Sequence, residues 1–567
     1  MNKRILCLLL VFALMLGACA MLASCGKKGE EETPRDPSEF DEQDRNVSKY
    51  YEYTWSTTSL NVELSEHSCA QELIPRVRRY LAGQDASAND PIDEDVRRRN
   101  GNAEKVTRTK INYTYLQDID TYAWGKNISR IANESKSYSD TSADIYINFI
   151  YDMVGAQLQG AFANLRSTSM YNATGINFFE FTASDYDAAT DDEGYMYDLM
   201  NSLSFSTRKM YVLTSDYLTD VVRAFFVVPV NIEMVNGIDV TMVERYDYDQ
   251  NGVFDIEDFF GIVWNYDWNY EAVKVLSQAV ANQVGEEPSL MDDTHGFALG
   301  TGVSGIHGVG ILYGTDVEII DRTLNNVTGY YEVSYPESAG AYGDFCDALA
   351  SLFETPGVTN IAGGSTSNTP SMKITQLFAN NQILLGGVIC AGNLEQTEYQ
   401  TMNAEGQGFG VAPVPMYREF NAAIDVDANN QNRYYRTASH NIAKCAGISV
   451  ATTKFKQCSA WLDYQSTHST DILNQYYEDK LQYAFAGNNP HNVKVLEVLR
   501  NNVSTALDKC YDDAVKAYSG QTDMRWCYLI RKAQWKPLEI RTDYSAAVEL
   551  KAAFLQQIQD KYDKLPE

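Results

Sequence analysis

The stretch Ala224-Phe-Phe-Val-Val-Pro-Val230 is an unbroken apolar run of mainly β-branched and aromatic residues, which predicts a buried strand. The run Asp144-Ile-Tyr-Ile-Asn-Phe-Ile150 predicts another short strand of the same kind. Between residues 271 and 284, apolar side chains instead recur every three or four positions, which predicts a helix that stops at Gly285. Strands that alternate with helices in this way favour an α/β fold.

Length and charge narrow the class of protein. The chain has 567 residues, enough for two to four domains at roughly 150 residues each. Its apolar content of 44% is typical of a globular protein. The net charge of -30 argues against binding to nucleic acid or to an anionic membrane surface.

The N-terminus has the features of a secretory signal peptide. Lys3 and Arg4 precede an apolar run, and no acidic residue occurs before Glu30. The segment ends in Leu22-Ala-Ser-Cys25, which resembles a bacterial lipobox, the motif whose cysteine is lipidated. We expect a signal peptide over residues 1–24 and a flexible tether over residues 25–48, lipidated at Cys25. Leu16-Gly-Ala-Cys19 is a second candidate, and a plain signal peptide with chance cysteines is the alternative.

Seven of the ten cysteines lie after the lipobox, and no two of them form a C-x-x-C pair. The sequence therefore shows no zinc framework. Export permits disulfides, and the pairs closest in sequence are Cys445–Cys458 and Cys510–Cys527. Buried free thiols are the state we expect for most of these residues.

Several segments, in order, resemble the extracellular solute-binding lipoproteins of ABC importers, of the sugar-binding type found in Gram-positive bacteria. One is Gly408-Phe-Gly-Val-Ala-Pro-Val-Pro-Met-Tyr417, in which Met416 replaces the lysine usual in the family. Before it in the chain come Trp268-Asn-Tyr-Glu-Ala-Val-Lys-Val-Leu276, Asp293-Thr-His-Gly-Phe297 and Gln376-Leu-Phe-Ala-Asn-Asn-Gln-Ile-Leu-Leu385. After it come Ala446-Gly-Ile-Ser-Val450 and the expected helix around Trp461. Residues 50–140 match the family poorly.

The resemblance implies an α/β, two-lobe, periplasmic-binding-protein-like fold of type II, with hinge strands that cross between the lobes. It places the crossings near residues 223–231 and 441–450. Lobe one would comprise residues 49–222 and 441–505, and lobe two residues 232–440, with the tail 506–567 packed back onto it. A small solute would bind in the cleft, and lobe closure around a solute is the hinge motion of this class of protein.

The resemblance also implies a receptor rather than an enzyme. Such a receptor would sit on the extracellular face of the cell membrane, held by its lipid anchor, and would deliver a small solute, expected to be a carbohydrate, to the membrane subunits of an ABC permease. The chain lacks an H-E-x-x-H pair, a G-x-S-x-G elbow and a P-loop. A secreted surface glycan hydrolase and an adhesion or scaffold lipoprotein without ligand binding are the alternatives.

Residues at strand ends and beside the crossings are candidates for contact with the solute. Aromatic rings cover the apolar faces of sugars and polar side chains bond the hydroxyls, and the chain is rich in tyrosine, with 38 residues. These considerations nominate the following residues for ligand binding: Tyr151, Asp152, Asn393, Tyr435 and His440. For each of them, an ordinary surface or core position is the alternative.

Residues 247–258 fit the 12-residue calcium loop, with oxygen ligands at positions 1, 3, 5, 9 and 12 and glycine at position 6. Position 7 offers the carbonyl of Val253. The expected ligands of a structural calcium ion are Asp247, Asp249, Asn251, Val253, Asp255 and Asp258. Asp258 is shorter than the usual glutamate, and an acidic turn before a helix is the alternative.

The stretch Gly300-Thr-Gly-Val-Ser-Gly305 matches the dinucleotide-binding pattern G-x-G-x-x-G. The residues that follow, Ile306-His-Gly-Val-Gly310, are rich in glycine and do not predict the start of a helix. A phosphate would then lack a helix N-terminus, so we expect a glycine-rich loop here.

Overall fold

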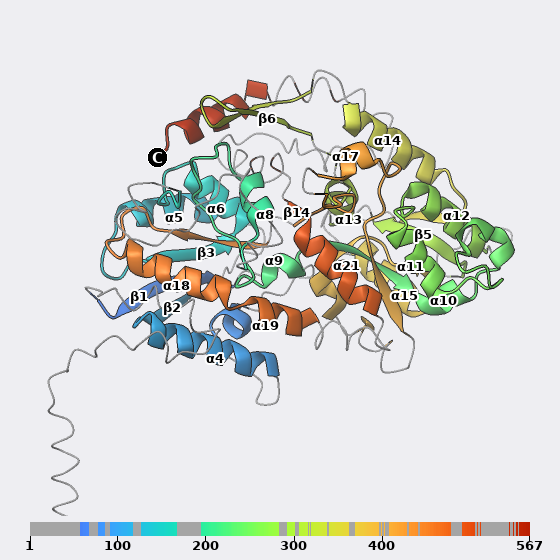
Figure 1. Cartoon of the computed structure of the whole chain (residues 1–567), viewed down its shortest axis with the longest axis horizontal. Coiled ribbons are helices and arrows are strands. Elements are labelled where there is room, and N and C mark those ends of the chain that lie inside the picture. Colours follow the sequence, from blue (N-terminus) through green and yellow to red (C-terminus); the bar gives the residue numbers. More distant parts are fainter. Residues whose placement is uncertain are drawn as a thin grey trace, which may run out of the picture. The chain divides into compact units, whose positions relative to one another are not determined.

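A computed structural model describes the chain in two mixed sheets with helices packed on them (Figure 1). The described residues are 57–66, 77–84, 91–116, 126–166, 194–282, 292–300, most of 306–361 and 369–402, 408–439 except two, 443–477, 490–504, and parts of 507–566. The expected signal peptide, tether and lipidated Cys25 lie outside them. Within them, no helix is both long and apolar enough to span a membrane.

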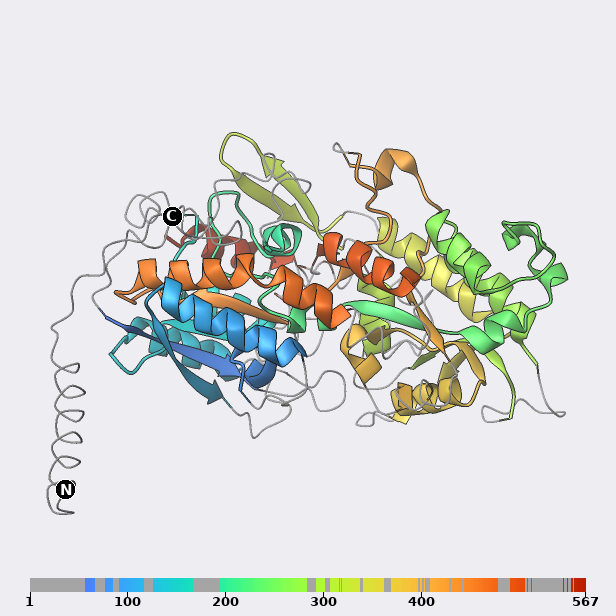
Figure 2. The ribbon, with the colours of Figure 1, turned by 60° about the horizontal axis from the view of Figure 1, so that its bottom comes forward.

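The first sheet has the strand order β13-β3-β1-β2. Its parallel strands are β1 (Ser59–Ser65), β2 (Lys110–Leu116) and β3 (Ile145–Phe149). β13 (Lys444–Ile448) comes from far along the chain and pairs with β3 in the antiparallel direction. Helices α4 (Pro91–Val106) and α18 (Phe455–Thr467) pack side by side at this sheet (Figure 2).

The second sheet has the order β10-β4-β9-β5-β8, with β11 also paired to β4. β4 (Phe226–Asn231) runs antiparallel to β9, β10 and β11, whereas β5 runs parallel to β8 and β9. The other strands are β5 (His295–Gly300), β8 (Val358–Ile361), β9 (Ile383–Leu385), β10 (Ile389–Cys390) and β11 (Phe409–Pro413). α12 (Tyr270–Val280) and α15 (Thr369–Ala379) pack on β5.

Two further pairs of strands lie outside these sheets. β6 (Asp321–Asn325) and β7 (Tyr330–Ser334) form an antiparallel hairpin, and β12 (Thr437–Ala438) pairs in parallel with β14 (Val503–Ser504). The remaining helices before β4 are η2 (Val77–Leu81), α5 (Lys126–Lys136), α6 (Ile150–Gln157), α8 (Tyr197–Ser202) and α9 (Asp220–Arg223). Those after it are α10 (Ile232–Asn236), η3 (Val240–Met242), η4 (Glu244–Tyr246), α11 (Ile256–Trp264), α12 (Tyr270–Val280), α13 (Ile306–Tyr313), α14 (Gly340–Phe353), α15 (Thr369–Ala379), η5 (Ala391–Glu395), α17 (Ala422–Asp425), α19 (Thr470–Gln475) and α21 (Pro490–Asn501).

The α/β fold expected from the sequence is confirmed, and the two predicted strands correspond to β3 and β4. α12 starts where its apolar spacing predicts, with Asn269 as the N-cap that accepts from the backbone of Glu271. It ends at Val280, before the expected Gly285, because Ala281 is already extended. The expectation of buried free thiols holds for the described cysteines Cys346, Cys390, Cys445 and Cys458.

The expectation that no helix starts at Ile306 is wrong, because α13 begins there. Glycine permits close packing at this helix. A Cβ added at Gly310 would lie 2.3 Å from Val388 and 2.8 Å from Phe226 of β4, closer than real side chains approach. Gly310 therefore serves the packing of α13 against the second sheet.

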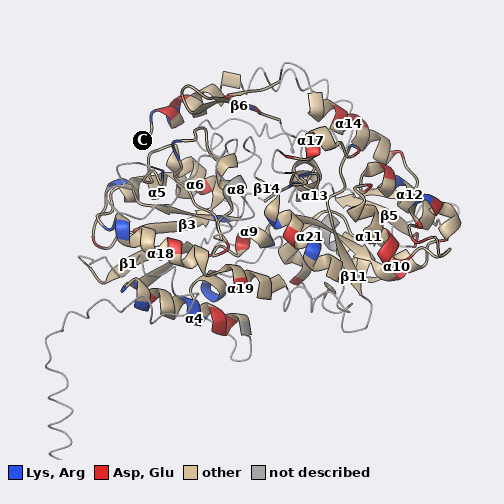
Figure 3. Cartoon of the chain, viewed as in Figure 1, with Lys and Arg blue, Asp and Glu red and all other residues tan. Residues whose placement is uncertain are grey.

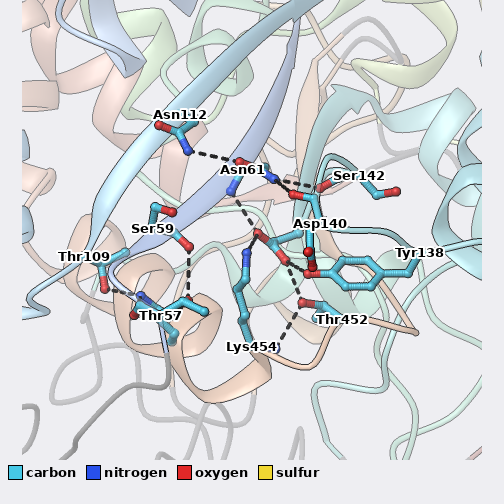
Figure 4. A network of polar contacts seen from close by, with 12 residues as sticks. Thr57, Ser59, Asn61, Thr109, Asn112, Tyr138, Asp140, Ser142, Thr452 and Lys454 are labelled. Atoms are coloured by element: carbon cyan, nitrogen blue, oxygen red, sulfur yellow. Dashed lines mark hydrogen bonds and ion pairs between the residues drawn. The ribbon is translucent and has the colours of Figure 1, made fainter.

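A network of polar contacts, drawn in part in Figure 4, surrounds Asp144, the residue directly before β3. The Asp144 carboxylate is fully buried and accepts from the backbone N–H of Asn61 (2.9 Å), from Tyr138 Oη (2.6 Å) and from Thr452 Oγ1 (2.7 Å). Lys454 Nζ lies 3.0 Å away and supplies the positive charge. The network ties β1, β3 and the segment after β13 together at one end of the sheet.

Two parts of the expected division into lobes are corrected by the structure. α21, assigned from the sequence to lobe one, packs on β11 of the second sheet, where the side chain of Asn492 accepts from the backbone of Val411 at 2.8 Å. The described part of the tail does not pack only on lobe two. Lys209 Nζ, on the lobe-one side, donates to the carbonyls of Asp563 (2.8 Å) and Leu565 (2.7 Å). The remaining lobe boundaries stay predictions.

Candidate functional site at the crossing between the sheets

The chain passes from the first sheet region to the second just before β4 and returns just after β12. Phe225 and Ser439, one from each passage, form an antiparallel β-bridge. The backbone N–H of Ser439 also donates to the carbonyl of Ser504 (2.9 Å), next to the β12–β14 pair. Segments far apart in sequence therefore lie together at one crossing.

A buried cluster of charged side chains lies at this crossing, on α9, η5 and β13. Figure 3 labels α9 and colours the ribbon at acidic and basic residues. Arg223, at the end of α9, is 1% exposed. Its Nη1 lies 2.7 Å from Asp220 Oδ1, and its Nε donates to Glu395 Oε1 at 2.9 Å. The same Glu395 oxygen accepts from Tyr476 Oη at 2.6 Å. Glu395 stands on η5, so it joins the second sheet to α9 and to the residue after α19.

Lys444, the first residue of β13, is the second buried cation of the cluster. Its Nζ lies 3.8 Å from Asp220 Oδ2 and 4.1 Å from the centroid of the Phe149 ring at the end of β3. Ammonium groups are attracted to the face of an aromatic ring, most strongly where water is excluded. The cluster thus balances two acids against two bases across three elements.

The electrostatics of the cluster favour the charged forms. Burial opposes the charge on Arg223, but the attraction of Glu395, followed by that of Tyr476 and Asp220, raises its pKa well above the usual value. Burial, and then the negative charge of Glu395, raise the pKa of Tyr476, so this phenol stays protonated and donates. Removing one partner from such a pair leaves a buried charge uncompensated, which typically costs about 3–5 kcal/mol.

Tyr151 and Asp152, proposed from sequence as solute contacts, lie in the first turn of α6, directly after β3. Both are buried, Tyr151 at 2% exposure and Asp152 at 1%. The Tyr151 ring stacks on Phe149 with centroids 5.7 Å apart, which connects it to the Lys444 side of the cluster. Asp152 Oδ2 accepts from Asn127 Nδ2 at 3.2 Å.

Asn393 is the predicted contact that the structure brings closest to the cluster from the second sheet. It is half-buried and lies on η5, two residues before Glu395. Tyr435 is buried instead among the rings of Tyr434 and Tyr266, and its Oη donates to the carbonyl of Val263 at 2.6 Å. His440 lies outside the described residues. The roles of all these residues in binding stay predictions.

Sequence reasoning missed the charged cluster itself: Asp220, Arg223, Glu395 and Lys444. One signal was present, because Arg223 and Lys444 are basic residues within or beside the two stretches assigned as crossings. A charged side chain in a stretch expected to be buried needs a partner, and such a residue marks a candidate site. The identity of the partner was not accessible, because Glu395 is remote in sequence.

The expected calcium loop forms a compact turn between η4 and α11. One carboxylate oxygen each from Asp247, Asp249 and Asp258 lies within 4.8 Å of the other two. Asp247 also accepts from the backbone N–H groups of Asn251 (3.1 Å) and Gly252 (3.0 Å), and Gly252 has φ +79, which suits glycine.

The donor set of the loop fits a hard cation. Calcium takes carboxylate and carbonyl oxygens, and three carboxylates converge here. Burial, and also the charges of Asp255 and Asp249, raise the pKa of Asp258, which a nearby cation would counteract. Asp255 instead caps α11 by accepting from the backbone of Glu257 at 2.9 Å, so its contact with an ion would pass through water.

Comparison with solved structures found distant similarities. An extracellular solute-binding protein from Staphylococcus aureus in complex with maltose is 12% identical, with a TM-score of 0.47 over 88% of this chain and 100% of that chain. The galacto-N-biose-/lacto-N-biose I-binding protein of an ABC transporter from Bifidobacterium longum is 10% identical, with a TM-score of 0.44 over 89% and 98%. The GacH receptor of Streptomyces glaucescens, solved with acarbose, is 12% identical, with a TM-score of 0.41 over 88% and 98%.

No family model and no curated protein matches the chain.

Proposed function

We propose that the chain is a lipid-anchored, extracellular solute-binding receptor that delivers a small solute, a carbohydrate, to an ABC permease. The observation that carries the proposal is the crossing, where two mixed sheets are joined at the Phe225–Ser439 bridge and by the contact of Glu395 with Arg223. Each sheet has its own helices and core, so a motion between them needs to bend only the connecting segments.

The placement of the candidate contacts supports this function. Tyr151 follows β3 at its crossing end, and Asn393 lies on η5 beside Glu395. A solute held by both would interact with the two sheets at once, and only contacts that are better in the closed state can drive closure. A ring beside amide and carboxylate groups provides the two kinds of surface that a sugar requires.

The test is a melting-shift screen of the full chain against mono- and oligosaccharides, with titration calorimetry of each hit. A binder present at a hundredfold excess over its Kd stabilises the folded state by about 2.7 kcal/mol, which raises the Tm. Chromatography of the same mixtures checks for cleavage. Product formation would support the alternative hydrolase, and the absence of any shift across the library would contradict a carbohydrate receptor.

We further propose a structural calcium ion in the loop 247–258. The convergence of the Asp247, Asp249 and Asp258 oxygens and the positive φ of Gly252 at position 6 support it. The ion would link η4 to the start of α11. Its role is to hold this turn and not to act in chemistry, because the loop's own oxygens occupy most of its ligand positions.

A further inference from the structure

The β6–β7 hairpin belongs by sequence to the second-sheet region but is bonded to the segment 201–208, which precedes the crossing. Ser206 and Tyr330 form an antiparallel bridge. On either side of it, the backbone N–H of Thr207 donates to the carbonyl of Gly329 and that of Tyr331 donates to the carbonyl of Phe205, both at 2.9 Å. The hairpin is thus held to this segment by a short stretch of sheet pairing.

Arg322 strengthens this attachment from the other strand of the hairpin. Its Nη2 donates to the carbonyls of Asn201 (3.0 Å) and Ser204 (2.9 Å). Its guanidinium carbon lies 4.1 Å from the centroid of the Tyr331 ring. The acceptors are neutral backbone carbonyls, so these hydrogen bonds do not depend on an acidic side chain that could be protonated.

The C-terminal tail follows the same route as the hairpin. Near α14, Tyr544 donates to the carbonyl of Pro336 at 3.3 Å, and its ring lies 5.8 Å from that of Tyr342. Further on, Gln559 Nε2 donates to the carbonyl of Tyr331 at 2.9 Å, and Tyr562 Oη lies 2.8 Å from Ser204 Oγ. The tail therefore contacts α14, the hairpin and the segment 201–208 in turn, as Figure 1 shows for the C-terminal helix beside β6.

We infer that the β6–β7 hairpin and those tail residues between 544 and 566 that the structure describes form a strap that ties the two lobes together in addition to the crossing, and that the strap limits how far they open. The inference rests on the proposed two-lobe receptor. From Ser334 of β7 to Gly340 of α14 the chain can span about 20 Å when fully extended. While the hairpin stays attached to the segment 201–208, this length bounds the separation of α14 from that segment.

The strap has a functional consequence for binding. A receptor that cannot open widely loses less freedom on closure, so a solute must supply less free energy to close it. Release of the strap should populate more open forms and weaken solute binding through the conformational equilibrium alone.

The test uses the full chain without solute and the double variant Arg322→Ala/Tyr562→Phe, which removes side-chain bonds to the segment 201–208. Thr323→Ala, at the exposed neighbouring position of β6, is the matched control. Hydrogen exchange is followed at the amides of Thr207 and Tyr331. Spin labels carried by unnatural amino acids at exposed Lys105 of α4 and exposed Gln376 of α15 report the distance between the lobes.

We expect exchange at both amides to become about tenfold faster and the label distances to become longer and broader in the double variant alone. Faster exchange with an unchanged distance distribution would overturn the inference, because the lobes would then keep their separation without the strap. Unchanged exchange would also overturn it, because the named contacts would not be what fastens the hairpin. Both readouts are taken without solute, so they do not depend on the carbohydrate screen. A failure of that screen would contradict the proposed receptor but would not change the outcome of the exchange and distance measurements.

Discussion

Glu395 Oε1 accepts from Arg223 Nε at 2.9 Å, and this bond joins η5, which follows β10, to the last residue of α9. Arg223 is almost fully buried, whereas the Glu395 side chain keeps 17% exposure. The carboxylate therefore lies at the edge of the cluster, and a change in its position alters its hydrogen bond to the Arg223 guanidinium.

The substitution Glu395→Gln should destabilise the fold. It keeps the size of the side chain but leaves two buried cations, Arg223 and Lys444, with Asp220 as the remaining acid of the cluster. We expect a loss of about 3 kcal/mol in the free energy of unfolding, measured by urea titration. Glu398→Gln, at an exposed position close by, is the matched control and should change stability by less than about 0.5 kcal/mol. Equal effects of the two substitutions would mean that the pair contributes nothing.

The substitution Asp144→Asn should also destabilise the protein, but at the far end of β3 from the crossing. Besides its attraction to Lys454, the carboxylate accepts from Asn61, Tyr138 and Thr452. The expected loss is about 3 kcal/mol. Solute affinity of the folded variant should stay unchanged in calorimetry, and a loss of affinity as large as that of a contact residue would contradict this placement.

The Asp144 network also predicts a dependence on alkaline pH. Burial opposes the charge of Lys454, but its bond to Asp144 outweighs this and raises the pKa of the lysine. Burial, followed by the bond to Asp144, raises the pKa of Tyr138. Both groups hold their protons more tightly in the folded state, so their stabilisation is complete below about pH 10 and is lost as the pH rises further. In Asp144→Asn this alkaline loss, followed by unfolding at graded pH, should be smaller than in the parent protein.

Calcium should raise the Tm of chelator-treated protein, by an amount that corresponds to about 2.7 kcal/mol at a hundredfold excess over Kd. The double substitution Asp247→Asn/Asp249→Asn removes two of the three converging carboxylates and should abolish the rise. Glu244→Gln, an exposed acid on η4 just before the loop, should leave the rise intact. A Tm that calcium leaves unchanged, in protein shown by elemental analysis to be metal-free, would argue against the site.

Asn393→Ala should weaken the binding of a solute found in the screen about tenfold, the effect of one or two lost hydrogen bonds. Asn326→Ala, at the exposed tip of the β6–β7 hairpin, is the control and should bind as the parent does. Titration calorimetry measures both. An unchanged affinity for Asn393→Ala would remove this residue from the site and with it the placement of the solute beside η5.

Cys25→Ala should release the protein from the membrane fraction and abolish its acylation. Fractionation of cells followed by mass spectrometry of the N-terminus provides the measurement. If the variant remains acylated and membrane-bound, Cys19 is the modified residue, and Cys19→Ala should then release it.

The elements that the sequence predicted well are those determined by local pattern. The apolar run before Phe149 and the three-to-four spacing after Asn269 each depend on near neighbours, and β3 and the start of α12 lie where these patterns place them. The elements that it missed depend on distant partners. The sequence did not predict the start of α13, because Gly310 disfavours a helix by local pattern. The glycine is needed there because a side chain would collide with Val388. The contacts of Lys209 with the last residues of the tail carry no local signal at all.

The position of β13 also determines the order in which the molecule can assemble. Lys444 of β13 pairs with Phe149 of β3, about 300 residues earlier in the chain, so the first sheet cannot be completed until the second has been synthesised. Until then β3 has an open edge, which can pair with another chain. A chain truncated anywhere between the two strands should therefore aggregate, and full-length protein should refold slowly, with a rate limited by the return of the chain to its first sheet.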